Sequence, residues 1–193
     1  MPLNPLLDTL SDYPFEALRT LLNPVTPVVN DPPVLMSLGE PQHQPPALLA
    51  ETLAAHAQEW NKYPPMAGTP ELRQAIRGWL GRRYRLAAGR LHPDRHVAAL
   101  SGTKEGLYLL ASLVVPHRKA GGRPVVLLPN PYYLVYNGAA TMAGADAVFL
   151  DATRDNGFLP DLAAIPAETL ERAALFYLCC RPTRRAPSPA SIT

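Results

Sequence analysis

A short segment near the middle of the chain combines residue types that bind phosphate groups. Ser101-Gly102-Thr103-Lys104 follows an apolar run and precedes a stretch with helical periodicity. Backbone N–H groups at the start of a helix have no acceptor within the helix, and the helix dipole makes this end positive. Two hydroxyls add hydrogen-bonding groups, and the glycine permits close approach of an anion. The segment therefore fits a phosphate cradle, but Ser and Thr are equally typical of an ordinary helix cap.

Other segments have residues suited to a binding site, although each alone also fits an ordinary turn or core. Ser37-Leu-Gly39-Glu-Pro41 is a loop marked by glycine and proline. Tyr63 begins a second loop, which leads into a capped helix. Tyr133 and Tyr136 follow an apolar run, and aromatic residues at helical spacing are more often core than cofactor platform.

Hydrophobic periodicity predicts the elements that position these segments. Short apolar runs predict four strands, over His96–Leu100, Pro124–Pro129, Ala147–Leu150 and Ala173–Leu178. Helical patterns predict helices over Ala47–Trp60, from Pro70 onward, over Gly106–Val115 and over Tyr132–Ala143. We expect His56 to be partly buried and Arg73, Arg77 and Arg82 to be solvated. Strands alternating with helices predict an α/β fold with a mostly parallel sheet that is covered on both faces.

Composition excludes several classes of partner. The chain has 193 residues, 47% of them hydrophobic, and a net charge of +2, which favours a globular domain without a nucleic-acid or membrane partner. The N-terminus lacks a signal sequence and no apolar run approaches about 18 residues, so we expect a cytoplasmic protein. Cys179 and Cys180 are adjacent, which suits neither a disulfide nor a metal site.

The order of the motifs resembles class I/II aminotransferases of fold type I. The matching motifs are Leu38-Gly39-x-Pro41, Tyr63-x4-Gly68-x2-Glu71-Leu-Arg73, Ser101-Gly102-Thr103 and Asn130-Pro-Tyr-Tyr133. The resemblance covers about residues 12–178 and implies an incomplete large domain, a three-layer α/β/α unit with an N-terminal arm. The segments 13–18, 37–41 and 156–161 are similar to N-succinyldiaminopimelate aminotransferases, enzymes of lysine biosynthesis.

For the parent enzyme, the resemblance implies a pyridoxal 5'-phosphate cofactor, a homodimer, and amino-acid and 2-oxo-acid substrates. For this chain, which lacks the lysine, we expect weak or no binding of the cofactor. The resemblance assigns the cofactor phosphate to Ser101, Gly102 and Thr103, and the face of the pyridine ring to Tyr133. By the same resemblance, Tyr63 reaches the phosphate in the other subunit, and Gly39 lies by the substrate carboxylate. The family often has tryptophan or phenylalanine where this chain has Tyr133.

The groups that would carry out the chemistry are not found in frame. Transamination needs a lysine amine that bonds to the cofactor and transfers a proton. Lys62, Lys104 and Lys119 all precede the position of the family's lysine, and none has its Ser-Lys context. The family's Asn-Pro-x-Gly loop would follow Cys179. Because the genetic code is degenerate, codons that encode the residues from Cys180 onward can, when read one frame over, encode Ser-Pro-Asn-Pro-Gln-Gly, which contains the missing loop motif. We therefore expect that a frameshift produced the tail. We also expect the chain to be inactive.

The expected organisation is an N-terminal arm and small-domain segment over 1–46, a partial cofactor-binding domain over 47–178 and a disordered tail over 179–193. Two alternatives stay open, a non-catalytic phosphate- or protein-binding module and a lyase of the same fold.

The resemblance also implies a strand order. If the strands are numbered along the chain, we take their order across the family's sheet to be first, seventh, sixth, fourth, fifth, second, third. Only the second and third strands of this chain would then be neighbours. Unpaired buried backbone groups cost about 1–3 kcal/mol each, so we expect an aggregation-prone chain or a smaller, repacked sheet.

Overall fold

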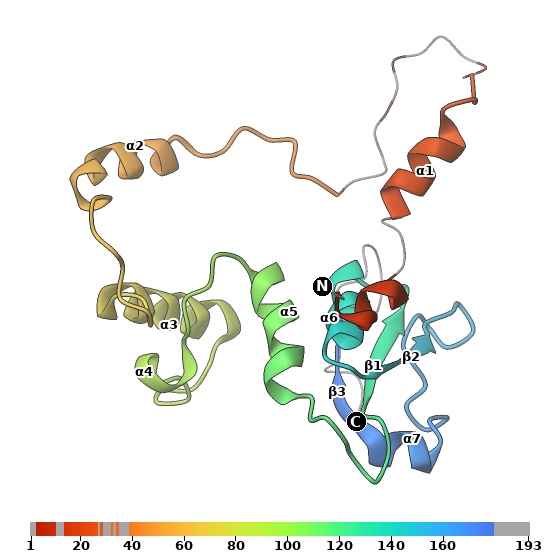
Figure 1. The fold of residues 1–193 in the computed structure, drawn as a ribbon. Coiled ribbons are helices and arrows are strands. Elements are labelled where there is room, and N and C mark those ends of the chain that lie inside the picture. Colours follow the sequence, from red (N-terminus) through yellow and green to blue (C-terminus); the bar gives the residue numbers. More distant parts are fainter. Residues whose placement is uncertain are drawn as a thin grey trace. The chain divides into compact units, whose positions relative to one another are not determined.

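The computed structural model of the chain describes residues 3–10, 14–26, 28, 32, 34 and 39–179. Contacts divide the chain into two compact units (Figure 1). The helical unit is Leu18–Ala99, and the sheet unit combines Met1–Ala17 with Leu100–Thr193. The domain boundary expected at residue 46 stays a prediction, and the tail expected after Cys179 lies outside the described residues.

The helical unit contains mainly exposed helices. These are most of α1 (Pro14–Leu22), α2 (Ala47–Ala55), a 3-10 turn η2 (Ala57–Glu59), α3 (Pro70–Tyr84) and α4 (Pro93–His96). The helix expected over Ala47–Trp60 therefore ends early, at His56, where φ is −108° and ψ is 17°. The prediction that His56 is partly buried is wrong, because its side chain is exposed and lies 2.9 Å from the Glu59 carboxylate.

Helix α3 begins as its sequence predicts. Pro70 occupies the first turn, and Thr69 Oγ1 accepts a hydrogen bond of 3.2 Å from the Leu72 N–H. The expectation that Arg73 is solvated is wrong, since only 13% of its side chain is exposed. Its guanidinium donates hydrogen bonds to backbone carbonyls that precede the helix. These bonds hold the side chain against the preceding loop and away from solvent, although Arg73 lies on the polar face of the helix.

The sheet unit follows the alternation expected from the sequence. Its elements are a 3-10 turn η1 (Pro5–Thr9), α5 (Thr103–Val114), β1 (Val125–Asn130), α6 (Leu134–Met142), β2 (Asp146–Asp151), α7 (Ala167–Arg172) and β3 (Ala173–Phe176). Gly144, at φ 75°, follows α6 where the sequence predicts its end. The second, third and fourth predicted strands are thus confirmed as β1, β2 and β3.

The three strands form one parallel sheet in the order β2-β1-β3. Val125–Asn130 pairs in unbroken register with Asp146–Asp151, and Val126 and Leu127 pair with Leu175 and Phe176. In the family order assumed above, these two strands are separated by the fifth strand, which this chain lacks. Their direct pairing gives the smaller, repacked sheet that was one of the two expected outcomes. Direct pairing satisfies backbone groups of β1 on both of its edges and buries it from both sides.

The first predicted strand, His96–Leu100, is also wrong. His96 ends α4, and residues 97–100 belong to no strand. Within the described part of the chain no strand lies beside this segment to accept its backbone hydrogen bonds. An apolar run alone does not make a strand, because the ladder requires a neighbour.

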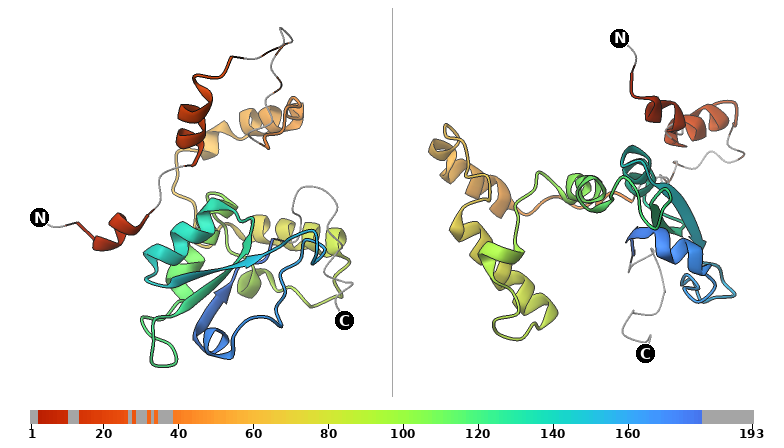
Figure 2. Two further views of the ribbon diagram at one scale, coloured as in Figure 1. Left: turned by 90° about the vertical axis from the view of Figure 1, so that its right-hand side faces the viewer. Right: turned by 60° about the horizontal axis from the view of Figure 1, so that its bottom comes forward.

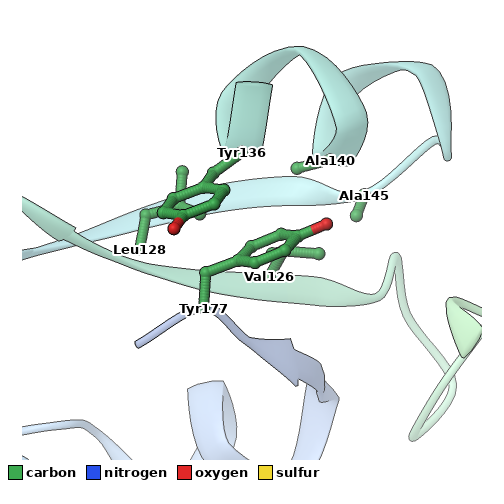
Figure 3. Close-up of a cluster of buried hydrophobic side chains, with 6 residues drawn as sticks. All are labelled: Val126, Leu128, Tyr136, Ala140, Ala145 and Tyr177. Carbon is green, nitrogen blue, oxygen red and sulfur yellow. The ribbon is translucent and has the colours of Figure 1, made fainter. Parts of the chain in front are cut away.

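Side chains of β1 alternate between two small cores. Val126 and Leu128 pack with Tyr136, Ala140, Ala145 and Tyr177 on the face covered by α5 and α6 (Figures 2 and 3). Val125 and Leu127 pack with Ile165 on the opposite face. This alternation is the period of two expected of a strand buried on both faces.

Candidate functional site

The turn that the sequence predicts as a phosphate cradle lies at the N-terminus of α5. Gly102 is the N-cap residue, with φ 150° and ψ 152°. A side chain at this φ would be strained, although a Cβ on Gly102 would meet no atom within 4 Å. Glycine is therefore needed here for backbone conformation, and the space beside it is open to a ligand.

Donors for an anion converge on this turn. The amides of Thr103, Lys104 and Glu105 open the helix, and no side chain caps them in the described structure. Glu105 instead accepts a 2.9 Å hydrogen bond from the Ser101 N–H through its Oε2. That bond fixes the turn from outside the helix, and the first-turn amides stay available. The donor set and the open space fit a phosphate group.

Gly106 is a residue of this turn that the sequence argument did not single out. A Cβ added to Gly106 would overlap the side chain of Leu100. Leu100 thus lies directly on the first turn of α5, which its glycine makes possible. A glycine inside a predicted helix costs about 0.5–1 kcal/mol relative to alanine, and that cost was the available signal of a close approach.

Tyr133, the expected ring-stacking residue, is the N-cap of α6 just beyond β1. Its side chain is 45% exposed. Its ring meets that of Tyr136 edge to face, with centroids 5.7 Å apart and planes at 87°. One side of the Tyr133 ring is thus supported from within the unit, while much of its surface is left for a flat ligand.

A polar network closes the same end of the sheet. Asn130, the last residue of β1, donates through Nδ2 to Asp151 Oδ1 at 2.8 Å. Asn156 Nδ2 donates to the Asp151 carbonyl at 2.7 Å, and the Thr153 N–H donates to Asn156 Oδ1 at 2.7 Å. These bonds fix the loop after β2, which belongs to a segment that carried the family resemblance.

The cradle and Tyr133 lie at one end of the sheet unit. Figure 1 shows the start of α5 at the end toward which the β1 arrow points, and Tyr133 follows the tip of that strand. Ligands of parallel α/β sheets bind at the carboxyl ends of the strands. The structure therefore brings together four predicted residues, Ser101, Gly102, Thr103 and Tyr133, at the end of the sheet where a ligand is expected.

Tyr63 and Gly39 belong to the helical unit. The Tyr63 side chain is fully exposed, and a Cβ on Gly39 would meet no atom within 4 Å. The loop after Tyr63 is held by Arg73, whose Nη1 donates to the Ala67 and Gly68 carbonyls at 3.3 and 2.5 Å. Arg73 Nη2 also bonds Asp94 at 2.8 Å. Sequence reasoning missed this role, because it depends on the path of a loop backbone.

The three lysines lie in different parts of the chain. Lys119 donates through Nζ to the Ala173 carbonyl at the start of β3, which makes it a structural residue. Lys104 lies on the exposed first turn of α5, and Lys62 lies in the helical unit. Among the residues that the structure covers, no group of three His, Cys, Asp or Glu could hold a metal ion.

Helix length and hydropathy bear on membrane association. Over the described ranges, no helix has both the length and the apolar character needed to cross a bilayer.

Comparison with known proteins gives consistent matches. The family model of aminotransferase class I and II matches residues 31–181. Proteins named LL-diaminopimelate aminotransferase are similar: that of Moorella thermoacetica is 35% identical over 75% of this chain and 36% of its own length, and that of Desulforudis audaxviator is 42% identical over 61% and 28%. The chain thus spans about a third of the length of these curated relatives.

Solved structures agree with the sequence matches. An aminotransferase from Neisseria meningitidis aligns with a TM-score of 0.83 and 32% identity, over 92% of this chain and 44% of that one. The aminotransferase AspB of Helicobacter pylori aligns with a TM-score of 0.74 and 30% identity, over 86% and 41%.

Proposed function

Because this chain belongs to the aminotransferase class I and II family, we propose that the complete protein is a pyridoxal-phosphate-dependent transaminase and that this chain supplies part of its cofactor site. The observation that supports the proposal most directly is the open turn at Gly102, which shares one end of the sheet with Tyr133. A phosphate cradle and an aromatic platform together suit a phosphorylated ring. The proposal includes a homodimer and a cytoplasmic location, as the sequence analysis expects.

In this proposal each residue has a physical task. The first-turn amides of α5 and the Ser101 and Thr103 hydroxyls bind the phosphate, with the helix dipole adding to the attraction. Tyr133 stacks on the ring and excludes water from one face. When bound, the cofactor supplies an electron sink for the carbanion formed at the substrate α-carbon. By the family resemblance, Gly39 would lie by the substrate carboxylate and Tyr63 would reach the cofactor phosphate of the other subunit.

We further propose that the substrate is an amino acid of the diaminopimelate type, with a 2-oxo acid as amino acceptor. Similarity to relatives named LL-diaminopimelate aminotransferase supports diaminopimelate without a succinyl group as the substrate. The resemblance in three segments had instead suggested the N-succinylated compound. Both carry an α-amino acid at the end that reacts and differ at the remote nitrogen, so they share one chemical class.

The substrate proposal is tested on the complete protein with one common acceptor, 2-oxoglutarate. The specificity constant kcat/KM is compared for LL-diaminopimelate, its N-succinyl derivative and aspartate. A kcat/KM at least tenfold higher for either diaminopimelate compound than for aspartate supports the proposed substrate class. The ratio of kcat/KM for the two diaminopimelate compounds then shows whether the enzyme prefers a free or a succinylated remote nitrogen. A preference for aspartate would contradict the proposal.

The proposal also says that the chain of 193 residues does not transaminate by itself. None of its lysines stands in the context of the family's lysine. Incubation with pyridoxal phosphate, reduction with borohydride and peptide mapping should find no stoichiometric adduct at a single lysine. A full adduct at Lys104, with amino transfer to 2-oxoglutarate, would show that this part is wrong. The variant Lys104→Arg keeps the charge and serves as the matched control.

A further inference from the structure

Tyr177 is a buried tyrosine of the sheet unit that lies in neither half of the proposed cofactor site. It follows β3, its side chain is only 4% exposed, and its N–H donates to the Leu127 carbonyl of β1 at 3.0 Å. Its backbone is therefore fixed to the central strand. Figure 3 shows the ring reaching from this edge into the core beside Val126.

The Tyr177 ring supports the expected ring platform through one intermediate. It stacks face to face on Tyr136, with centroids 4.3 Å apart and planes within 5° (Figure 3). Tyr136 in turn meets Tyr133 edge to face at 5.7 Å. Three aromatic rings thus run in contact from the buried core to the exposed platform. Such pairs prefer defined geometries, so the position of Tyr177 bears on that of Tyr133.

The Tyr177 hydroxyl reaches the other half of the site. It donates a hydrogen bond of 2.6 Å to the carbonyl of Leu107, which is 70 residues away in sequence. Leu107 lies one turn into α5, directly after the turn whose amides form the cradle. Much of that helix is exposed, with Leu107 and Ala111 facing the core. The hydroxyl therefore ties the cradle to the sheet.

We propose that Tyr177 is a positioning residue that sets the separation between the phosphate cradle on α5 and the ring platform at Tyr133. This inference rests on the proposed cofactor site. A phosphate and a ring in one molecule lie at a fixed distance, so both halves of the site bind together only if their separation matches. One side chain links the two halves: its ring stacks on Tyr136, which supports Tyr133, and its hydroxyl bonds Leu107, which follows the cradle in α5.

The test compares two ligands on this chain. Inorganic phosphate needs the cradle alone, whereas pyridoxine 5'-phosphate needs cradle and platform together and forms no bond to lysine. Tyr177→Phe removes the hydroxyl and keeps the ring stack. Tyr108→Phe makes the same change at a partly exposed tyrosine of α5 and is the control. Dissociation constants for both ligands are measured by tyrosine and tryptophan fluorescence or calorimetry.

Loss of one hydrogen bond of this kind is expected to weaken pyridoxine 5'-phosphate binding about fivefold. Inorganic phosphate should change by less than about twofold, and Tyr108→Phe should change neither. Unfolding of part of the sample weakens both ligands by the same factor, so the ratio of the two affinities reports on geometry even if Tyr177→Phe is less stable.

Three results would overturn the inference. If both ligands weaken equally, Tyr177 has only a structural role. If neither changes, the hydroxyl does not position the cradle; in both cases the proposed cofactor site would stand. If the unaltered chain binds neither ligand, the cofactor site itself fails as a property of this chain, and the inference fails with it.

Discussion

The two halves of the candidate cofactor site are built differently. Tyr133 follows β1, a strand paired on both edges and buried on both faces, and its ring leans on a buried tyrosine stack. The phosphate turn at 101–103 follows a segment that forms no strand, and its residues are exposed. The ring platform is thus packed against the sheet core, whereas the cradle is held by Leu100, the hydrogen bond from Ser101 to Glu105 and the Tyr177 hydroxyl.

This contrast arises because the segment before Tyr133 has neighbouring strands, whereas the segment before the phosphate turn has none in the described structure. Strand β1 gains a neighbour on either side, so its apolar run becomes a sheet core. Residues 97–100 are also apolar but have no strand beside them in the described structure. Preorganisation of a binding site is therefore uneven, and ligand binding should order the phosphate half more than the ring half.

The largest expected effect is a difference in stability loss between a substitution in the core, at Leu128, and one in the segment before the cradle, at Leu100. Leu128 is fully buried, so Leu128→Ala should lower the free energy of unfolding by about 2–5 kcal/mol. Leu100 is 52% exposed, and Leu100→Ala should cost no more than about 1 kcal/mol. Urea denaturation followed by far-ultraviolet circular dichroism measures both. Equal losses would contradict the contrast between the two halves.

The next effect concerns the conformation of the cradle. Gly102→Ala places a Cβ at φ 150°, which should cost about 1–3 kcal/mol or force the turn to move. Binding of pyridoxine 5'-phosphate should fall about tenfold or more. Gly138→Ala is the control, because it lies inside α6 with no atom within 4 Å of the added Cβ, and it should raise stability by up to about 1 kcal/mol. Unchanged affinity in Gly102→Ala would remove the turn from the site.

A smaller effect is expected from the ionisation of Tyr177. Burial, and secondly the charge interaction with Tyr136, raises the pKa of the Tyr177 phenol above its ordinary value of 10.0. The folded state therefore favours the neutral phenol, and its contribution to stability is complete below pH 10 and is lost as pH rises through the folded pKa. As the pH rises above 10, the urea concentration at the midpoint of unfolding should decrease. The decrease should be smaller for the variant Tyr177→Phe. Parallel curves for the two proteins would contradict this linkage.

Local patterns predicted much of the sheet unit. The apolar runs at 124–129, 147–150 and 173–178 became β1, β2 and β3, because their partners are other runs of the same kind. The helices at 106–115 and 132–143 were confirmed as α5 and α6 with small shifts at their ends. The cap at Thr69 was likewise readable, since it depends on neighbouring residues alone.

Features that depend on distant contacts were not predictable in this way. The bond from Tyr177 to Leu107 joins residues 70 apart, and the burial of Arg73 depends on the carbonyls of a preceding loop. The strand order and the absence of a strand at 97–100 depend on which strands lie side by side. Periodicity describes one element and contains no information about its neighbours.

Hydrogen exchange measured by mass spectrometry tests the uneven site most directly. In the unliganded chain, amides of Val126–Leu128 and Leu175–Phe176 should be strongly protected and those of Val97–Glu105 weakly protected. Adding pyridoxal 5'-phosphate should slow exchange at 101–106 while leaving the amides of β1 unchanged. Strong protection of Val97–Leu100 without ligand, or no slowing at 101–106 with it, would contradict this account.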